Sequence, residues 1–445
     1  MRIAPALLRL ACVVTASGTA RVVAAGPAPT TTADRPYVVV DTGQRHVFDT
    51  TRALTVAPAA GSPLAGQDGG YDGPQPSYRD LGDGTVLDVV TGLVWQKAPE
   101  LDRLPTFPEA LAGAKTLRLA GHDDWRLPTI KELYSLMLFE GDSRARTPRP
   151  YLDARVFGFR FGDPARGERT IDAQYWSSTE YLGTTMRGAA TVFGVNFADG
   201  RIKGYPRDVG PDGRPARHFA RYVRGNPAYG RNDFHDEGDG TVLDRATGLV
   251  WSKADSGKPL DWAGALAWAE GLVLAGHDDW RVPHAKELQS LVDYGRAPDA
   301  TDPARRGPAI DPVFTVTDPD AWGWSSTTHL EGPGGPGSAV YLAFGRATGL
   351  MPGPRGLRRV DVHGAGAQRS DPKQGDPTSA RWASGMGPQG DEIRILLYAR
   401  AVRDLVPGTT KRATPDLSPL PPSRHGGPEG GPPPGPPQGP PPGGR

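Results

Sequence analysis

The sequence predicts an α+β fold in which one structural unit occurs twice. Residues 83–98 (DGTVLDVVTGLVWQKA) and 239–254 (DGTVLDRATGLVWSKA) are identical at 13 of 16 positions. Residues 119–137 and 274–292 agree at 14 of 19 positions, and the two pairs of segments lie 156 and 155 residues apart. Because ordered motifs at a near-constant offset indicate a duplication, we expect two tandem domains.

Each unit begins with a predicted β-hairpin followed by two helices. In the first copy, residues 85–87 and 93–95 are rich in β-forming side chains and flank a turn-rich segment. Residues 106–109 have the spacing of a capping box, and Asp261 caps the equivalent helix of the second copy. A second capping box at 129–132 opens the next helix, where the second copy has His284, a cap weaker by about 1 kcal/mol.

Short strands complete the unit. The motif Trp-Ser-Ser-Thr occurs at 176–179 and 324–327, and each copy is followed by a strand-like run, 191–197 and 339–344, with Asp199-Gly200 as a turn. Six of the ten tryptophans lie within the repeated motifs, namely Trp95, Trp125, Trp176, Trp251, Trp280 and Trp324. We expect these indoles to form the two domain cores and not a platform for stacking sugars.

The ordered motifs GDGTVLDxxTGLVWxKA, GHDDWRxPxxKEL, WSST and a closing RxVR resemble the Lcl C-terminal domain family, also called domain of unknown function 1566. The resemblance covers residues 77–225 as copy 1 and 233–404 as copy 2. It implies two tandem C-type-lectin-like domains with long loops, related to the formylglycine-generating enzymes. It also implies an exported bacterial protein, since at least one family member is an adhesin that binds sulfated polysaccharide.

Two departures limit what the resemblance implies about chemistry. Formylglycine-generating enzymes work through cysteines, and the only cysteine here is Cys12, near the start of the chain. The Glu-Pro-Asn or Gln-Pro-Asp and Trp-Asn-Asp motifs of calcium-dependent lectins are also absent from the sequence. We therefore expect no enzyme activity and no cofactor, with calcium left open.

The chain ends predict export and a flexible tail. Residues 1–25 have the basic start, apolar stretch and small residues of a signal peptide, and residues 26–76 form an N-terminal extension. A Gly/Pro-rich insertion at about 352–390 is confined to copy 2. Residues 405–445, which end in a stretch of almost only Pro and Gly, are expected to be disordered. The mature protein would lie in the periplasm, at the cell surface or in the medium.

Charge and hydropathy exclude two kinds of partner. Lys and Arg number 51 against 50 Asp and Glu, a net charge of +1, and removal of residues 1–25 with their three arginines gives −2. A nucleic-acid-binding protein would carry a cationic surplus. No later run approaches the ~20 apolar residues that span a bilayer, so we expect no transmembrane segment.

A basic strand is the strongest ligand-binding candidate. Arg201, Lys203, Tyr205 and Arg207 alternate, so a strand would place three cations and an aromatic ring on one face. That face could bind the sulfate or carboxylate groups of a glycan, or could be a solvated face whose charges prevent aggregation. Copy 2 has Arg355, Arg358 and Arg359 in the corresponding order, without the alternation.

Acidic groups offer weaker candidates for a metal site. The repeated His-Asp-Asp triplets could bind a divalent ion, although turn residues bonded to backbone amides are the competing interpretation. Their members are His122, Asp123, Asp124, His277, Asp278 and Asp279. The aspartates of the predicted hairpins lack the alternating spacing of a calcium loop, which favours turns. These residues are Asp80, Asp83, Asp88, Asp236, Asp239 and Asp244.

Two functions remain open from the sequence. One is an exported, non-enzymatic recognition or adhesion protein that binds a glycan, such as a sulfated polysaccharide, or another envelope component. The other is a structural cell-envelope protein that acts through protein contacts and binds no small ligand. The sequence predicts no oligomeric state.

Overall fold

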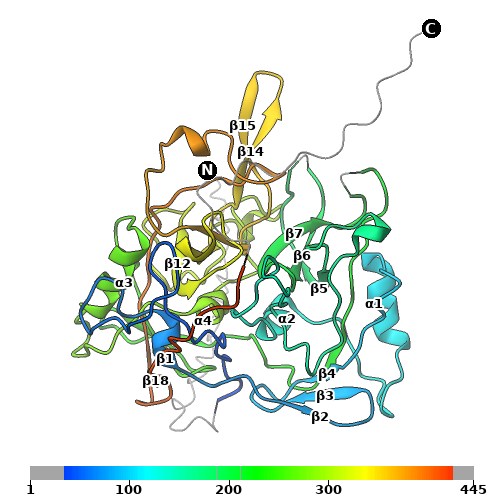
Figure 1. Ribbon diagram of the computed structural model, residues 1–445, viewed down its shortest axis with the longest axis horizontal. Coiled ribbons are helices and arrows are strands. Elements are labelled where there is room, and N and C mark those ends of the chain that lie inside the picture. The colour runs from blue at the N-terminus through cyan, green and yellow to red at the C-terminus, as the bar shows by residue number, and fades with distance from the viewer. Residues whose placement is uncertain (1–34, 187, 211, 424–445) are drawn as a thin grey trace, which may run out of the picture.

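The computed structural model describes residues 35–186, 188–210 and 212–423 (Figure 1). The expected signal peptide, residues 1–25, lies outside these described residues. The fold combines helices and strands, with far more residues in strands than in helices. It consists of two tandem domains, as the repeats predicted.

One antiparallel sheet of six strands, in the order β12-β13-β16-β7-β6-β5, forms the centre of the fold. Copy 1 supplies β5 (Gln174–Glu180), β6 (Thr191–Asn196) and β7 (Arg201–Pro206), and copy 2 supplies β12 (Trp322–Thr328), β13 (Ser338–Ala343) and β16 (Gln368–Pro372). The copies meet where Ile202 of β7 pairs with Gln368 of β16. The two domains therefore share one continuous sheet, and β5 and β12 are its two edge strands.

The shared sheet has local two-fold symmetry. Trp176 pairs with β6 in copy 1 as Trp324 pairs with β13 in copy 2, which fixes the same register in both halves. The register that these pairs fix makes Ile202 of β7 and Gln368 of β16 equivalent residues of the two copies. Because equivalent residues face each other across the antiparallel β7–β16 pair, the local two-fold axis passes between them.

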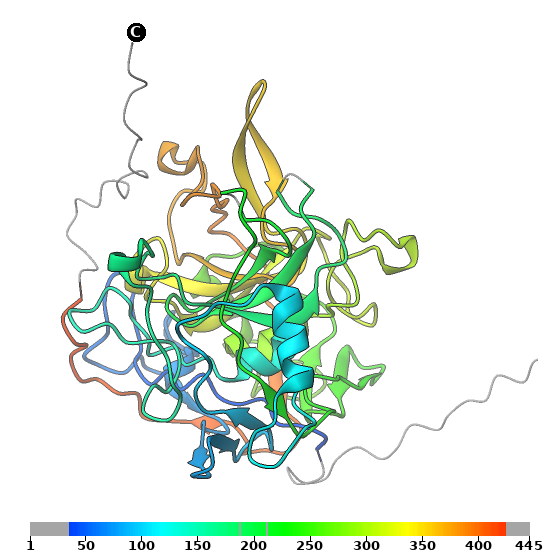
Figure 2. The same cartoon turned by 90° about the vertical axis from the view of Figure 1, so that its right-hand side faces the viewer.

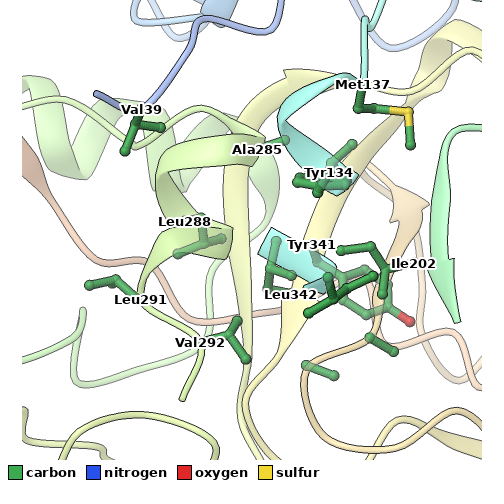
Figure 3. Packing of buried hydrophobic residues seen from close by; sticks show 14 of the residues in the cluster. Val39, Tyr134, Met137, Ile202, Ala285, Leu288, Leu291, Val292, Tyr341 and Leu342 are labelled. Carbon is green, nitrogen blue, oxygen red and sulfur yellow. The ribbon is translucent and has the colours of Figure 1, made fainter. Parts of the chain in front are cut away.

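Two short helices cover one face of the sheet around this axis. They are α2 (Ile130–Ser135) and α4 (Ala285–Ser290), and their apolar side chains pack between the two copies (Figure 3). Lys131 Nζ on α2 donates to the carbonyl of Ser290 at 2.7 Å. Lys286 Nζ on α4 donates to the carbonyl of Ser135 at 2.8 Å. Each helix thus holds the last turn of the other, which ties the copies together.

The longer helices, α1 (Phe107–Thr116) and α3 (Trp262–Glu270), begin at the predicted caps. Both predicted capping boxes of copy 1, at Thr106 and Thr129, are confirmed. The indole N–H of Trp176 donates to the carbonyl of Pro105, just before α1, and Trp324 binds Leu260 before α3 in the same way. All six repeat tryptophans are buried, which confirms their predicted place in the cores.

Each copy also has a small four-stranded sheet that contains its predicted hairpin. In copy 1 its strands are β2 (Tyr78–Asp80), β3 (Thr85–Asp88), β4 (Val94–Gln96) and β8 (Val223–Arg224). In copy 2 they are β9 (Phe234–Asp236), β10 (Thr241–Asp244), β11 (Leu249–Ser252) and β17 (Val402–Asp404). The closing RxVR segment of each copy returns to pair with its own hairpin, which closes the domain.

The extra residues of copy 2 fall into two segments on either side of a core strand. The first contains the hairpin β14 (Thr348–Gly353) and β15 (Gly356–Asp361), which projects from the body (Figures 1 and 2). The second lies between β16 and the segment that leads to β17. The range 352–390, expected to be an insertion, therefore includes β16, the counterpart of β7.

The N-terminal extension and the start of the tail pack together and contact both copies. Strand β1 (Tyr71–Asp72) pairs with β18 (Lys411–Arg412), and the amide of Asp416 donates to the carbonyl of Arg45. The expectation of disorder is therefore wrong for residues 405–423, which gain backbone partners from a segment that the sequence left unassigned. Residues 424–445 lie outside the described part of the chain.

The remaining helical turns are short 3-10 segments. They are η2 (Asp68–Gly70), η3 (Pro164–Arg166), η4 (Pro303–Arg305), η5 (Gly335–Gly337) and η6 (Ala380–Trp382). Among the described residues, none of the helices has both the length and the apolar character needed to cross a bilayer.

Candidate functional site

A cleft of about 670 Å³ opens between the two copies, beside the start of α2. Copy 1 contributes the Arg126–Glu132 segment and the serine and threonine that end its WSST motif. Linker residues between 227 and 232 complete the walls, together with Phe234, Asp311 and residues 291–294 of copy 2. The cleft is thus built from two of the repeated motifs together with residues that only the pairing of the copies brings near.

The copy 1 wall is held by a bidentate ion pair and a threonine. Arg126 donates to both carboxylate oxygens of Glu132 at 2.5 Å, and 36% of the Arg126 side chain is exposed. Thr179 Oγ1 accepts a hydrogen bond from the amide of Ile130 at 3.0 Å. No acceptor for the Thr179 hydroxyl proton occurs among the described residues, so this proton is available to a ligand in the cleft.

The charges around the cleft are balanced. Its basic residues are Arg126, Lys131 and Arg231, and its acidic residues are Glu132, Asp293 and Asp311. Burial lowers the pKa of Lys131 to about 8, while the carboxylates of Asp244 and Asp293 oppose this change. Arg231 is exposed and has no carboxylate partner in the described part of the chain. Such a lining suits a polar ligand better than a densely anionic polymer.

The symmetry-related place in copy 2 is filled. Arg281 forms the same bidentate pair with Glu287 at 2.6 Å, but only 5% of its side chain is exposed. The ring of Tyr71 lies 5.6 Å from the Arg281 guanidinium, and Thr410 Oγ1 accepts from it at 3.3 Å. Burial alone would raise the pKa of Glu287, but the Arg281 charge and hydrogen bonds lower it to about 2.

Three side chains of the N-terminal extension, Thr42, Gln44 and Asp68, occupy this second place, and we call them the plug. Thr327, the counterpart of Thr179, donates to Asp68 Oδ2 at 2.6 Å. Thr42 donates to the same oxygen at 2.7 Å. The Gln44 carboxamide bonds to both the amide and the carbonyl of Thr328 on edge strand β12, each at 2.9 Å. It also donates to the carbonyl of Phe139 in copy 1.

The carboxyl group of Asp68 in the plug has a raised pKa. Burial, followed by the nearby charge of Asp41, raises the pKa of Asp68 to about 8. The hydrogen bonds from Thr327 and Thr42 act in the opposite direction without reversing the effect. A carboxyl group in this position is thus stable in its neutral form near neutral pH.

The basic strand that we expected to face solvent lies instead between the copies. Arg201 and Lys203 contact Asp199 at 2.8 and 3.2 Å, and their side chains are 13% and 17% exposed. Arg201 also donates to the carbonyl of Glu331. The expected solvent-facing arrangement is therefore wrong for this pair, because β7 is a central strand covered by the loops of copy 2. Burial lowers the pKa of Lys203 to about 7.

Tyr205 and Arg207, the other two candidates, have different surroundings from Arg201 and Lys203. The ring of Tyr205 is largely buried and lies 4.7 Å from the ring of His218. Arg207, beyond the end of β7, is 39% exposed and contacts Glu180 and Asp208 at 3.1 and 3.2 Å. The four candidates consequently do not form one binding face.

The His-Asp-Asp triplets lie in exposed turns. Leu119 and His122 form a bridge around Ala120, whose φ of 53° marks a tight turn, and copy 2 repeats the arrangement. Asp124 contacts Arg224 at 2.7 Å, and Asp279 contacts Arg403 at 2.6 Å. No group of three metal-ligating side chains is present among the described residues.

The remaining triplet members, Asp123, His277 and Asp278, are exposed in the same two turns. The hairpin aspartates bond to nearby backbone amides, as turn residues do. This agrees with the turn interpretation of these acidic residues.

Comparison with known families decides the relationship of the chain. The profile of the Lcl C-terminal domain matches residues 84–224 and 240–353. The chain belongs to the Lcl C-terminal domain family. No curated protein and no solved structure matches the sequence.

The two Lcl C-terminal domain copies differ at the cleft, and only a few residue differences in the sequence indicate this. Of the two WSST serines in copy 1, Ser177 is buried, whereas Ser178 lies in the cleft wall. Two of the five differences between residues 119–137 and 274–292 lie here, where copy 1 has Thr129 and Ile130 and copy 2 has His284 and Ala285. This divergence marks the place where one copy faces the cleft and the other faces the plug.

Proposed function

We propose that this protein is an exported, non-enzymatic recognition or adhesion protein that binds a glycan or another envelope component in the cleft of copy 1. The observation that carries the proposal is the cleft itself, which polar, charged and apolar side chains line together. Its volume of about 670 Å³ falls within the range of small-molecule binding sites. The C-type-lectin-like fold implied by the family resemblance is part of the same proposal.

The lining of the cleft supports a glycan. Ser178 and Thr179 bring hydroxyl groups, Arg231 brings a guanidinium, and Tyr294 also lines the cleft. Hydroxyl and charged groups in a cleft that also contains an aromatic ring match the polar and apolar surfaces of a sugar. Because the charges of the lining balance, we expect affinity for particular sugar residues and weak affinity for heavily sulfated chains.

A glycan array followed by calorimetry tests the proposal. The informative variant is Arg231→Ala, because Arg231 lies at the cleft and its removal breaks no ion pair with a described residue. Arg355→Ala, at the exposed tip of the β14–β15 hairpin, is the matched control. We expect Arg231→Ala to weaken binding and Arg355→Ala to leave it unchanged. Absence of binding to every glycan would refute the proposal.

The β14–β15 hairpin favours a second candidate, a structural envelope protein that acts through protein contacts. It forms a separate two-stranded sheet, and residues 355–359 are exposed, including Leu357 at 50%. Unpaired strand edges can pair with another chain. A stoichiometric protein partner recovered from envelope extracts, and lost with Leu357→Glu, would support this function.

A further inference from the structure

The contacts of Thr327 in copy 2 indicate which chemical group the cleft of copy 1 binds. Thr179 and Thr327 are equivalent residues of the repeated WSST motif, and each accepts a hydrogen bond from the first amide of the helix that precedes the motif in its copy, α2 or α4. In copy 2 the Thr327 hydroxyl donates to the carboxyl group of Asp68. In copy 1 the Thr179 hydroxyl faces the cleft.

The groups that fill copy 2 are a compact set of polar functions. They are the carboxyl group of Asp68, the hydroxyl of Thr42 and the carboxamide of Gln44. Asp68 stands far from the other two in sequence, so a single extended peptide would not present all three together. The plug also forms no regular strand pairing with edge strand β12, which it meets through the Gln44 side chain. An acidic sugar carries carboxyl and hydroxyl groups within one ring, and an N-acylated acidic sugar adds the amide.

The geometry points to a carboxyl-bearing sugar as the ligand of the copy 1 cleft, with Thr179 donating to its carboxyl group as Thr327 donates to Asp68. This inference rests on the proposed glycan-binding function and names the sugar class. Arg231, at the cleft and without an acidic partner among the described residues, supplies a positive charge for the ionised carboxylate. Since the plug already fills copy 2, each chain binds one such group.

The other contacts of the plug explain why copy 1 has room for a ligand. Lys286 donates to the carbonyl of Asp41, next to the plug, whereas its counterpart Lys131 donates to Asn232 in the linker at 2.8 Å. The linker thus satisfies the lysine of copy 1 without covering Thr179. The Thr179 hydroxyl therefore stays accessible from the cleft, whereas the Lys131 ammonium group does not.

Calorimetric titration of the full chain with an oligosaccharide of hexuronic acid tests the inference. Carboxyl-reduced and sulfated neutral oligosaccharides of the same length are the comparison ligands. Thr179→Val removes the hydroxyl while keeping the shape, Thr179→Ser restores it, and Thr327→Val is the matched change in copy 2. We expect Thr179→Val to weaken uronate binding about tenfold or more, because a hydrogen bond to a charged group is lost. Thr179→Ser and Thr327→Val should bind as the wild type does.

The outcomes separate the two proposals. Equal affinity for the uronate and its carboxyl-reduced form, or unchanged uronate binding by Thr179→Val, overturns the carboxyl assignment and leaves glycan binding intact. Binding of the sulfated oligosaccharide alone has the same consequence. Failure of all oligosaccharides overturns the proposed function together with this inference. Binding of an aspartate-containing peptide in their place would assign the cleft to polypeptide and overturn the sugar assignment.

Discussion

The two copies carry the same motifs at equivalent positions, yet one is open where the other is filled. Arg126 and Thr179 border a cleft, whereas Arg281 and Thr327 are buried beneath the N-terminal extension. The repeated residues make the same internal bonds in both copies, so the motif itself serves the fold. The difference arises from what lies over the motif, which is the linker in copy 1 and the plug in copy 2.

The largest expected difference between the copies concerns the equivalent ion pairs. Arg281→Ala leaves Glu287 ionised and buried, which should lower the free energy of unfolding by about 3–5 kcal/mol. In Arg126→Ala the remaining Glu132 is also buried, at 2% exposed, but the lost arginine was 36% exposed, so water from the cleft can reach the carboxylate and we expect a smaller loss of about 2 kcal/mol. Denaturant unfolding of the two variants checks this, and equal losses would contradict the contrast between open and filled copies.

A second test removes the plug carboxamide. Gln44→Ala leaves the buried amide and carbonyl of Thr328 and the carbonyl of Phe139 without their partner. We expect a loss of about 2–3 kcal/mol in the free energy of unfolding, since each unsatisfied buried group carries a cost. Gln374→Ala, whose exposed side chain bonds to Thr50, is the matched control and should cost little. A loss as small as that of the control would show that Gln44 does not fill the site.

The pH dependence of stability tests the state of Asp68. Its pKa of about 8 lies above that of an unfolded aspartate, so the folded state holds a proton that the unfolded state releases. This stability is present at pH 4 and below and is lost as the pH rises toward 8, at no more than about 1.4 kcal/mol per pH unit. Asp68→Asn should remove this dependence in urea titrations from pH 4 to 9. Thr42→Val should lower stability and keep the dependence; a wild-type profile for Asp68→Asn would contradict the assignment.

The smallest expected effect distinguishes the two helix caps. His284 caps α4 through its Nδ1, which accepts from the amide of Glu287 at 3.2 Å, and it forms a complete capping box. His284→Thr should therefore change the free energy of unfolding by less than about 1 kcal/mol. Thermal unfolding checks the value, and a large gain in stability would show that the imidazole is a poor cap.

Local features of the fold could be predicted from the sequence because they depend on near neighbours. The capping boxes at Thr106 and Thr129 follow from spacings of three residues, and the β3–β4 hairpin follows from one turn. The buried tryptophans follow from their place in the repeats. In each case the residues that decide the structure lie within one motif.

The shared sheet and the plug could not be predicted in this way. The bridge between Ile202 and Gln368 joins distant parts of the chain, and Gln44 reaches Thr328 from the opposite end. The alternation of Arg201 and Lys203 correctly predicted a strand, but a period of two does not tell whether a charged face meets solvent or another domain. The cleft depends on these long-range pairings, so the sequence did not predict it.

The stoichiometry of sugar binding tests the difference between the copies most directly. Calorimetric titration of the wild-type chain with a hexuronic acid oligosaccharide should give one site per chain, because the plug occupies the equivalent place in copy 2. Two equivalent sites per chain, or none, would contradict the account.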